Sequence, residues 1–336
     1  MKQAMFYEKL KDGSVRCTLC PRYCVIRPEG RGYCGARMNK DGVLYTLTYG
    51  LVSSIANDPI EKKPLFHFYP GSMVLSLGTY GCNMRCPGCQ NWEIAHIDPS
   101  GSPNLLPDEC VKIALRERSK GIAWTYNEPT IWFEYTYETA ILARDKGLYT
   151  VYVTNGYINQ EPLDTIAPYL SAYRVDIKAF KPEAYTRIAN VKDFQPILNS
   201  AIRAKKNWGI HVEIVTNITP TINDDEEQLR NIAVWIRDNL GPETPWHVTR
   251  FVPHYQLRNL YATPLSTMEK AYDIGRSSGL KYVYIGNVPG HRYENTYCYN
   301  CGSLLIERFG FSIERYLIKG NRCPDCGAEQ YIVGGN

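Results

Sequence analysis

Three cysteines lie close together in one short segment of the chain, GCNMRCPGCQNW. Cys82, Cys86 and Cys89 have the spacing C-x3-C-x2-C, which places three thiolates in one loop. A purely structural zinc site needs four protein ligands, and so does an electron-transfer 4Fe–4S cluster. A 4Fe–4S cluster held by only three cysteines leaves one iron open to a small molecule. The alternative is that these cysteines belong to a zinc site or to disulfides.

The sequence around this loop indicates which elements position it. Residues 73–79 read as a buried strand, so the cysteines follow a strand's carboxyl end, where α/β barrels place their chemistry. Further strands are predicted at 121–126, 149–154, 173–178, 211–217 and 246–251, with 281–285 as a candidate. Helical patterns lie between them at 107–119, 130–145, 161–170, 195–207, 224–239 and 266–278. This alternation predicts a parallel sheet with right-handed crossovers.

Polar side chains follow the ends of the predicted strands, where a packed core would not need them. Asn127 and Glu128 follow the second strand, and an acceptor there can hold an ammonium group beside a metal. Asn155 follows the third strand, where its amide could hydrogen-bond a ribose or a carboxylate. Asp176 and Lys178 end the fourth strand and share one face, because strand side chains alternate. A structural ion pair is the alternative for these two residues.

Two groups of four cysteines flank this region. Cys17, Cys20, Cys24 and Cys34 lie in a segment with little apolar sequence, which needs a metal to fold; zinc and a second iron–sulfur cluster both fit. Cys298, Cys301, Cys323 and Cys326 form two C-x2-C-G knuckles around a predicted hairpin, similar to a zinc ribbon or rubredoxin. We expect zinc rather than iron at this second group. Cys110 is left over and is expected to fill the core from an amphipathic helix.

The C-x3-C-x2-C motif after a first strand resembles the signature of the radical S-adenosylmethionine (SAM) enzymes. Both flanking cysteine groups and the segments Y-N-E-P and D-I-K extend the resemblance over nearly the whole chain. Taken together, these features resemble the AmmeMemoRadiSam system radical SAM protein. Such proteins are similar to pyruvate formate-lyase activating enzyme. The resemblance implies that the open iron binds the amino and carboxylate groups of SAM. One electron then breaks a C–S bond and gives a 5′-deoxyadenosyl radical that abstracts hydrogen.

The resemblance also implies which residues contact SAM. Y-N-E-P occupies the place of the family's Gly-Gly-Glu segment, which binds the SAM amino group, and D-I-K resembles the glycyl-radical-activating branch. His254 lies in a segment similar to a Pro-x-His-x-Leu region that contacts SAM, with the histidine shifted by one residue. Such a loop histidine is more often a surface or core residue. Gly88 stands where the family has an aromatic residue near the adenine, so Trp92 is a candidate for that contact. The expected SAM-binding residues are Gly88, Gln90, Asn127, Glu128, Asn155, Asp176, Lys178 and His254.

The resemblance implies an α/β fold with a partial, TIM-like (β/α)6 barrel, and the count of six strand–helix units agrees with it. We expect a Cys-rich metal-binding region at 1–70, the barrel at 71–290, and a two-knuckle metal-binding domain with four cysteines at 291–336. The net charge of +4 is too small and too evenly spread to indicate nucleic-acid binding. Without an 18-residue apolar run or a signal-peptide core, the sequence predicts a cytoplasmic protein with no membrane partner.

Three functional hypotheses from different classes remain. The first is a glycyl-radical activase, which D-I-K and His254 favour. The second is a radical SAM enzyme that modifies another protein, an RNA or a small molecule, which the additional cysteine groups favour. The third is a non-enzymatic electron carrier or metal-assembled binding module, against which the three-cysteine site argues. Either enzyme would need an electron donor of the ferredoxin or flavodoxin type. The sequence assigns no side chain a catalytic role separate from metal or SAM binding.

Overall fold

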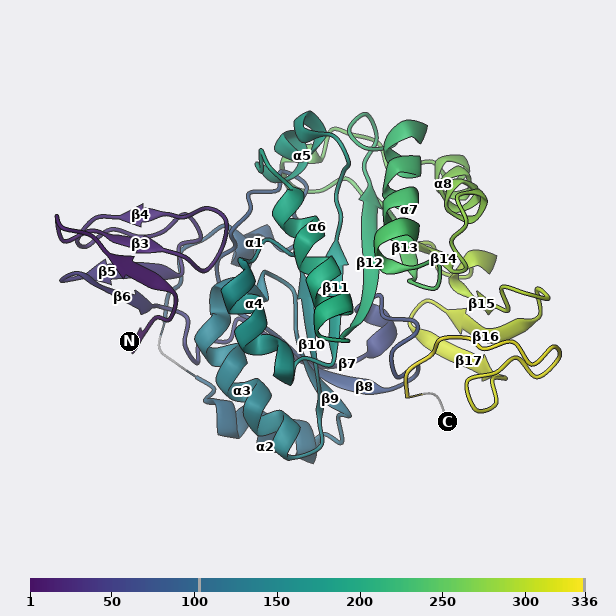
Figure 1. The fold of residues 1–336 in the computed structure, drawn as a ribbon, viewed down its shortest axis with the longest axis horizontal. Coiled ribbons are helices and arrows are strands. Elements are labelled where there is room, and N and C mark those ends of the chain that lie inside the picture. Colours follow the sequence, from purple (N-terminus) through teal and green to yellow (C-terminus); the bar gives the residue numbers. More distant parts are fainter. Residues whose placement is uncertain (102–103, 335–336) are drawn as a thin grey trace. The chain divides into compact units, whose positions relative to one another are not determined.

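The chain is described over residues 1–101 and 104–334 by a computed structural model, whose main feature is a mixed α/β architecture (Figure 1). Within these residues the largest sheet has eight strands in the order β14-β13-β12-β11-β10-β9-β8-β7. The strands are β7 (Ser54–Pro59), β8 (Met73–Gly78), β9 (Gly121–Trp124), β10 (Tyr149–Thr154), β11 (Ala172–Asp176), β12 (His211–Ile218), β13 (Trp246–Arg250) and β14 (Val283–Gly286). Neighbours β8–β9, β9–β10, β12–β13 and β13–β14 pair in parallel. The predicted α/β class with a parallel sheet is confirmed.

Helices follow most of these strands. They are α1 (Trp92–Ala95), α2 (Pro107–Arg116), α3 (Phe133–Asp145), α4 (Gln160–Ile166), α5 (Pro182–Ala189), α6 (Gln195–Ile202), α7 (Glu226–Leu240) and α8 (Leu265–Ser277). Short turns are η1 (Ile60–Lys62), η2 (Pro129–Trp132), η3 (Ala167–Tyr169), η5 (Tyr255–Leu257), η6 (Arg292–Glu294) and the π-helical η4 (Arg203–Asn207). All six predicted helices are present. Strand β7 and the short helices α1 and α5 were not predicted.

The ends of α7 illustrate how the sequence sets a helix boundary. The Asp225 side chain accepts a hydrogen bond from the Gln228 backbone N–H, which satisfies one of the free donors of the first turn. Glu226 and Glu227 add negative charge at the positive end of the helix dipole. The helix stops at Gly241, whose φ of 99° is a conformation that residues with a Cβ rarely adopt.

The chain divides into two compact units. The first comprises Met1–Asp58, Met73–Tyr173 and Asp193–Ile210, and the second comprises Pro59–Ser72, Arg174–Lys192 and His211–Asn336. The division therefore passes through β7 and β11. The boundaries expected from the sequence, 1–70, 71–290 and 291–336, stay a prediction, and residues 335–336 of the last range lie outside the described residues.

The first unit has its core around β8, β9 and β10. Nearly every residue of these strands is buried, because helix α3 packs against β9 and β10 (Figure 1). Trp124 of β9 meets Tyr152 of β10 edge to face, with ring centroids 5.7 Å apart. The N-terminal part adds two small antiparallel sheets, with strand orders β1-β6-β5 and β2-β3-β4. Their strands are β1 (Lys2–Gln3), β2 (Tyr7–Lys9), β3 (Val15–Cys17), β4 (Val25–Ile26), β5 (Arg37–Lys40) and β6 (Val43–Thr46).

The second unit is built on β12, β13 and β14, with α7 and α8 packed together and α8 packed against β13 and β14. Gly275 of α8 permits this close approach, because a Cβ at this position would lie 2.8 Å from the Val283 side chain. Its C-terminal part is a three-stranded sheet in the order β15-β16-β17. The strands are β15 (Thr296–Tyr297), β16 (Leu304–Phe309) and β17 (Ser312–Tyr316). Strands β16 and β17 pair antiparallel, so the predicted C-terminal hairpin is confirmed.

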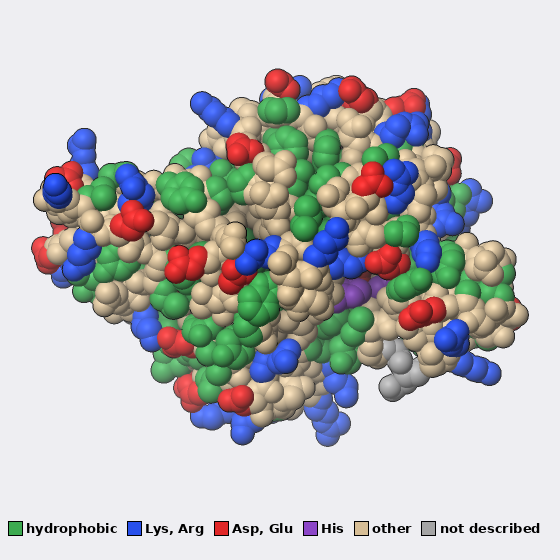
Figure 2. All heavy atoms as spheres, in the orientation of Figure 1, with side chains coloured by type: hydrophobic (Ala, Val, Ile, Leu, Met, Phe, Trp, Pro, Cys, Tyr) green, Lys and Arg blue, Asp and Glu red, His purple; other side chains and the backbone are tan. Residues whose placement is uncertain are grey.

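No helix in the described ranges combines the length and the apolar character needed to span a bilayer. Figure 2 shows basic and acidic side chains interspersed over the face in view, without a large area of one sign. This distribution agrees with the small net charge of +4.

Candidate functional site

The three central cysteines lie on the loop between β8 and α1, at the carboxyl end of β8, as predicted. All three are half-buried. The loop is folded by its own backbone: the Met84 N–H donates to Cys82 Sγ at 3.4 Å, and the Cys89 N–H donates to the Cys86 carbonyl at 3.2 Å. Desolvation raises the pKa of Cys82 well above its usual value, and the nearby charge of Glu128 adds to this effect. A cation bound at the thiolate would offset that cost.

Asn127 fixes the position of this loop. Its Oδ1 accepts a hydrogen bond from the Thr79 N–H at 3.1 Å, and its Nδ2 donates to the Gly81 carbonyl at 2.8 Å. Both partners lie within the three residues before Cys82. Asn127 was predicted to contact a ligand. Its amide oxygen and nitrogen both bind the backbone of the cysteine loop and so attach the segment after β9 to that loop.

The Asn155 side chain reaches a cysteine sulfur from the end of another strand. It follows β10, is 6% exposed, and places its Nδ2 3.8 Å from Cys82 Sγ. The same Nδ2 donates to Asn83 Oδ1 at 2.8 Å, and Asn83 Nδ2 donates to the Tyr157 carbonyl at 2.8 Å. Asn83 was not singled out from the sequence, since an asparagine between two cysteines carries no signal of its own. These contacts bring the end of β10 against the loop that follows β8.

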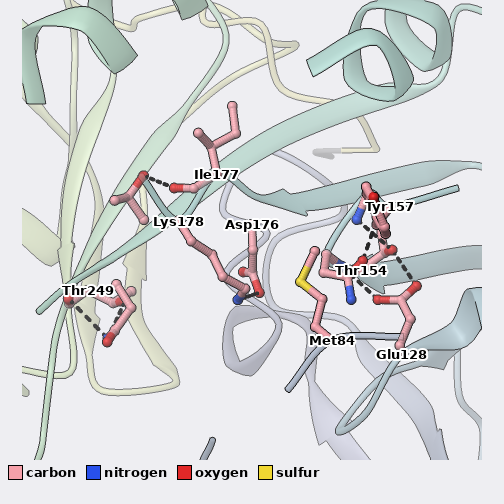
Figure 3. A network of polar contacts seen from close by, with 12 residues as sticks. Met84, Glu128, Thr154, Tyr157, Asp176, Ile177, Lys178 and Thr249 are labelled. Atoms are coloured by element: carbon pink, nitrogen blue, oxygen red, sulfur yellow. Dashed lines mark hydrogen bonds and ion pairs between the residues drawn. The ribbon is translucent and has the colours of Figure 1, made fainter. Parts of the chain in front are cut away.

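Glu128 is 2% exposed, and its carboxylate lies among hydrogen-bond donors from the chain (Figure 3). One oxygen accepts from the Thr130 N–H at 3.0 Å and the Thr154 hydroxyl at 2.7 Å, and the other accepts from the Asn155 N–H at 2.8 Å. Burial raises the pKa of Glu128, and these hydrogen bonds oppose the rise. A carboxylate has about four acceptor positions, so three of them are used by the protein.

In the second unit, Asp176 and Lys178 share one face of the chain, as the alternation of β11 predicted. Lys178 Nζ lies 2.8 Å from Asp176 Oδ2 (Figure 3), and Arg174 pairs with the other carboxylate oxygen. Burial alone would raise the pKa of Asp176, but the charges of Arg174 and Lys178 outweigh it and lower the pKa. Arg174 was missed, although it lies two residues before Asp176 and the same alternation identifies it. The group therefore carries two positive charges and one negative charge.

The remaining predicted SAM-binding residues lie on loops. Gly88 is half-buried and Gln90 is exposed, both on the cysteine loop, while Trp92 is half-buried at the start of α1. In the second unit, His254 is half-buried just before the turn η5. The role of each of these residues in ligand binding stays a prediction.

The C-terminal cysteines form a compact metal-binding arrangement. The sulfurs of Cys298, Cys301, Cys323 and Cys326 all lie within 4.8 Å of one another, and the pairs 298–326 and 301–323 are 3.6 Å apart. Each knuckle turns at a glycine with positive φ, Gly302 at 78° and Gly327 at 73°. Hydrogen bonds with Ser303 lower the pKa of Cys301 to about 6, which favours the thiolate form that binds metals. The predicted four-cysteine site is therefore assembled as a unit.

The other cysteine groups are more widely spaced. Within the described ranges, the central three sulfurs do not all lie within 4.8 Å of one another, and the same holds for any three of the N-terminal four. Cys17, Cys20, Cys24 and Cys34 nevertheless line one cavity in the first unit. Cys110 is fully buried in α2, in agreement with the core position expected for it.

Comparison with known proteins identifies the family. Residues 76–236, which include the end of β8, the cysteine loop and the strands β9 to β12, match the model of the radical SAM superfamily. Over 337 aligned residues the chain is 47% identical to uncharacterized protein MJ0808 of Methanocaldococcus jannaschii, covering 99% of this chain and 100% of that protein. The chain belongs to the radical SAM superfamily.

More distant relatives of this radical SAM protein include activating enzymes. Pyruvate formate-lyase-activating enzyme of Clostridium pasteurianum is 27% identical over 195 residues, which cover 54% of this chain and 77% of that enzyme. Among solved structures, a radical SAM methyltransferase from Sphaerobacter thermophilus is similar with a TM-score of 0.50 and 16% identity. That match covers 65% of this chain and 67% of the methyltransferase, and it supports the fold alone.

Proposed function

We propose that this chain reductively cleaves SAM at a 4Fe–4S cluster bound by Cys82, Cys86 and Cys89, and that it activates a partner protein by abstracting hydrogen from a glycine. The observation that carries the proposal is the three-cysteine loop at the end of β8, with the side chains of Asn127 and Asn155 attached to it. Membership of the radical SAM superfamily supports the first part. The relationship to a pyruvate formate-lyase-activating enzyme supports the second.

The residues of the loop fit such a cluster. Three thiolates are too few for a closed structural zinc site, and they leave one iron of a 4Fe–4S cluster available to SAM. The raised pKa of Cys82 indicates that its thiolate is costly in this environment unless a positive metal centre lies beside it. The Asn155 amide, 3.8 Å from Cys82 Sγ, is placed to donate to a sulfur of the bound cluster.

When bound, a reduced cluster would supply one electron to SAM, whose C–S bond would break to give methionine and the 5′-deoxyadenosyl radical. The protein's contribution is to hold the thiolates and to orient the ligands. Asn127 keeps the backbone before Cys82 in place through Thr79 and Gly81. Asn155 orients Cys82 from the end of β10.

We propose that Glu128 acts mainly by positioning. Its carboxylate holds the Asn155 backbone N–H at 2.8 Å, and Asn155 in turn lies beside Cys82. One acceptor position of the carboxylate stays free for the SAM amino group, which the sequence comparison with the family's Gly-Gly-Glu segment suggested. Both roles predict that cleavage depends on this residue.

For Asp176, Lys178 and His254 we retain the proposal that they contact SAM. Its basis is the sequence argument that the carboxyl ends of successive parallel strands converge on one mouth. Arg174 and Lys178 carry two positive charges, and Asp176 neutralises one of them. The remaining positive charge supports a role in binding a carboxylate. The reductant would be a protein of the ferredoxin or flavodoxin type.

A second candidate function is the modification of another protein, an RNA or a small molecule. The two flanking cysteine groups favour it, because they add metal sites that hydrogen abstraction from a glycine would not by itself require. For the C-terminal group we propose zinc. Its sulfur separations of 3.6 Å are close to the value of about 3.8 Å that four thiolates 2.3 Å from a tetrahedral ion would have.

The test is SAM cleavage by the full chain after anaerobic reconstitution with iron and sulfide. With dithionite as reductant, the wild type should release 5′-deoxyadenosine, and the triple variant C82A/C86A/C89A should release none. C110A is the matched control, since Cys110 lies outside all three cysteine groups. Cleavage that persists in the triple variant would show that the proposed site is wrong.

The activase role needs its own measurement. A candidate glycyl-radical enzyme incubated with the reconstituted chain and SAM should develop the EPR doublet of a glycyl radical. Labelling that enzyme with α-deuterated glycine should transfer deuterium into 5′-deoxyadenosine. Deuterium transfer from an RNA or a small molecule instead would favour the second candidate function.

A further inference from the structure

The N-terminal and C-terminal cysteine groups contain the same number of cysteines, yet they differ in how their sulfurs are arranged. The four C-terminal sulfurs lie within 4.8 Å of one another, as a single ion bound by four thiolates requires. Within the described residues, no three of the N-terminal sulfurs are that close, although all four cysteines line one cavity. A cluster in which each thiolate binds its own iron holds the sulfurs farther apart than a single ion does.

The wall of this cavity suits a buried, thiolate-rich centre. Leu19, Ile26 and Ile131 supply apolar side chains that exclude water. Arg22 and Arg37 also line it. Glu134 neutralises Arg37, so the positive charge of Arg22 is the one that opposes the net negative charge of a cluster with four thiolate ligands. This lining fits zinc and iron–sulfur centres alike, so it is the spacing of the sulfurs that distinguishes the two.

Arg37 is held beside this cavity by a buried ion pair with Glu134. It is 1% exposed, and its two terminal nitrogens donate to the Met5 carbonyl at 2.7 Å and to Glu134 Oε1 at 2.6 Å. Its Nε is buried with no hydrogen-bond partner in the described part of the chain, and Glu134 Oε2 is likewise unpaired. The Nε–H lies on the same edge of the guanidinium as the Nη2–H that donates to Glu134, so the two unpaired atoms belong to one buried Arg37–Glu134 ion pair.

The cavity also adjoins the central cysteine loop. Arg22 Nε donates to the Asn83 carbonyl at 2.7 Å, and Asn83 itself lines the cavity. Arg85 Nη2 donates to the Tyr33 carbonyl at 2.7 Å, beside Cys34. A Cβ added at Gly81 would lie 2.4 Å from the Cys34 carbonyl oxygen, so only glycine permits this contact one residue before Cys82. The ligands of the two sites therefore belong to loops in direct contact.

We propose that Cys17, Cys20, Cys24 and Cys34 bind an iron–sulfur cluster rather than a zinc ion, and that this cluster lies beside the loop that carries Cys82. The identity of this metal centre is independent of the proposed function, whereas its closeness to a second cluster rests on the proposed central cluster.

Acid-labile sulfide provides the test, because neither zinc nor a single iron with four thiolates contains it. The full chain is reconstituted anaerobically with ferrous iron and sulfide, and iron, zinc and sulfide are counted per chain. We expect about eight sulfides in the wild type and in C110A, and about four in C82A/C86A/C89A and in C20A/C24A. Mössbauer spectra of the triple variant should then show a cubane cluster with four thiolate ligands.

The outcomes separate this proposal from the proposed function. About four sulfides in the wild type that all disappear in the triple variant, with zinc at the N-terminal group, would overturn the proposal and leave the central cluster intact. About four sulfides that survive in the triple variant and disappear in C20A/C24A would support the proposal and contradict the central cluster. Because the triple variant leaves the N-terminal group untouched, the test does not depend on whether C20A/C24A folds.

The closeness of the two clusters has a separate spectroscopic test. In dithionite-reduced wild type, neighbouring paramagnetic clusters should broaden each other's EPR signals and shorten their relaxation times. The comparison spectrum is the sum of the triple variant and C20A/C24A, each with one cluster. A wild-type spectrum identical to that sum would overturn the proposed contact.

Discussion

The central cysteine loop and the C-terminal cysteine group both use the spacing C-x2-C, but they are supported in different ways. The C-terminal group is local: its knuckles bracket the β16–β17 hairpin, and Gln330 and Asn300 place amide nitrogens near its sulfurs. The central loop supplies only three cysteines and is held by Asn127 and Asn155, which come from the ends of other strands. A closed site of four ligands stabilises a fold. A site that combines three ligands with side chains from several strands is suited to binding a further molecule.

The largest expected effect is on the closed site. Cys323→Ala should abolish metal binding there and unfold the C-terminal sheet, since metal binding to four-thiolate sites supplies on the order of 10 kcal/mol of folding free energy. Thermal unfolding and metal content of the full chain measure this. SAM cleavage should persist in the variant, in contrast to C82A/C86A/C89A. If the variant kept both its metal and its unfolding temperature, the C-terminal group would not be a stabilising four-ligand site. The contrast with the central loop would then fail.

A smaller effect is expected on the support of the central loop. Glu128→Ala leaves the Thr154 hydroxyl and the Asn155 N–H without their acceptor, and should lower SAM cleavage by about 100-fold. His254→Ala should lower it less, because Glu128 matches its family position directly. Rates of 5′-deoxyadenosine formation in the two variants, with cluster content measured alongside, decide the order. The reverse order would indicate that Glu128 has no part in the reaction.

For the acidic residue of the second unit, we expect a moderate effect on binding. Asp176→Asn removes the charge that separates Arg174 from Lys178 and should weaken SAM binding about tenfold, the cost typical of one charged hydrogen bond. Asp273→Asn, an exposed change of the same chemistry on α8, is the control. Equilibrium SAM binding measures both variants. Equal affinities would place Asp176 outside the SAM site and leave it as a structural ion pair.

A dependence of the second unit's stability on pH is also expected. Burial lowers the pKa of His67 to about 3, and its Nε2 lies 2.7 Å from the Tyr284 hydroxyl. Burial alone would raise the pKa of Glu213, but its hydrogen bonds with His211 and His247 outweigh it and lower the pKa. Both groups bind protons more readily when unfolded. The stability they provide is therefore complete at neutral pH and is lost as the pH falls, from about 6.5 downward for His67 and from about 4.5 for Glu213.

The expected loss is about 1.4 kcal/mol per pH unit for each titrating group. Hydrogen exchange between pH 7 and pH 5 should show loosening of residues 296–333, because His67 contacts the Tyr331 carbonyl and Tyr284 contacts Thr296. Residues 79–92 of the central loop should change less. His67→Gln should flatten the dependence, and an unchanged slope in that variant would mean that another group controls it.

The sequence predicted the order of strands and helices well because that information is local. Alternation of apolar runs with capped helices located β8 to β14 and the helices α2 to α4 and α6 to α8. It did not reveal β7, whose residues 54–59 are mostly half-buried, or the helices α1 and α5. Cysteine spacing likewise divided eleven cysteines into three groups and left Cys110 in the core.

By itself, the sequence determined the family, the parallel sheet and the membership of each cysteine group. Tertiary structure decided what spacing could not. The C-terminal sulfurs lie within 4.8 Å of one another, while the N-terminal four cysteines line a cavity. The Glu128 carboxylate accepts hydrogen bonds from Thr130, Thr154 and Asn155. It also revealed Arg174 beside Asp176 and Asn83 between two cysteine sites. The physical reason is that backbone periodicity reports local conformation and burial. Metal geometry, desolvation and hydrogen-bond commitment depend on distances between residues far apart in the chain.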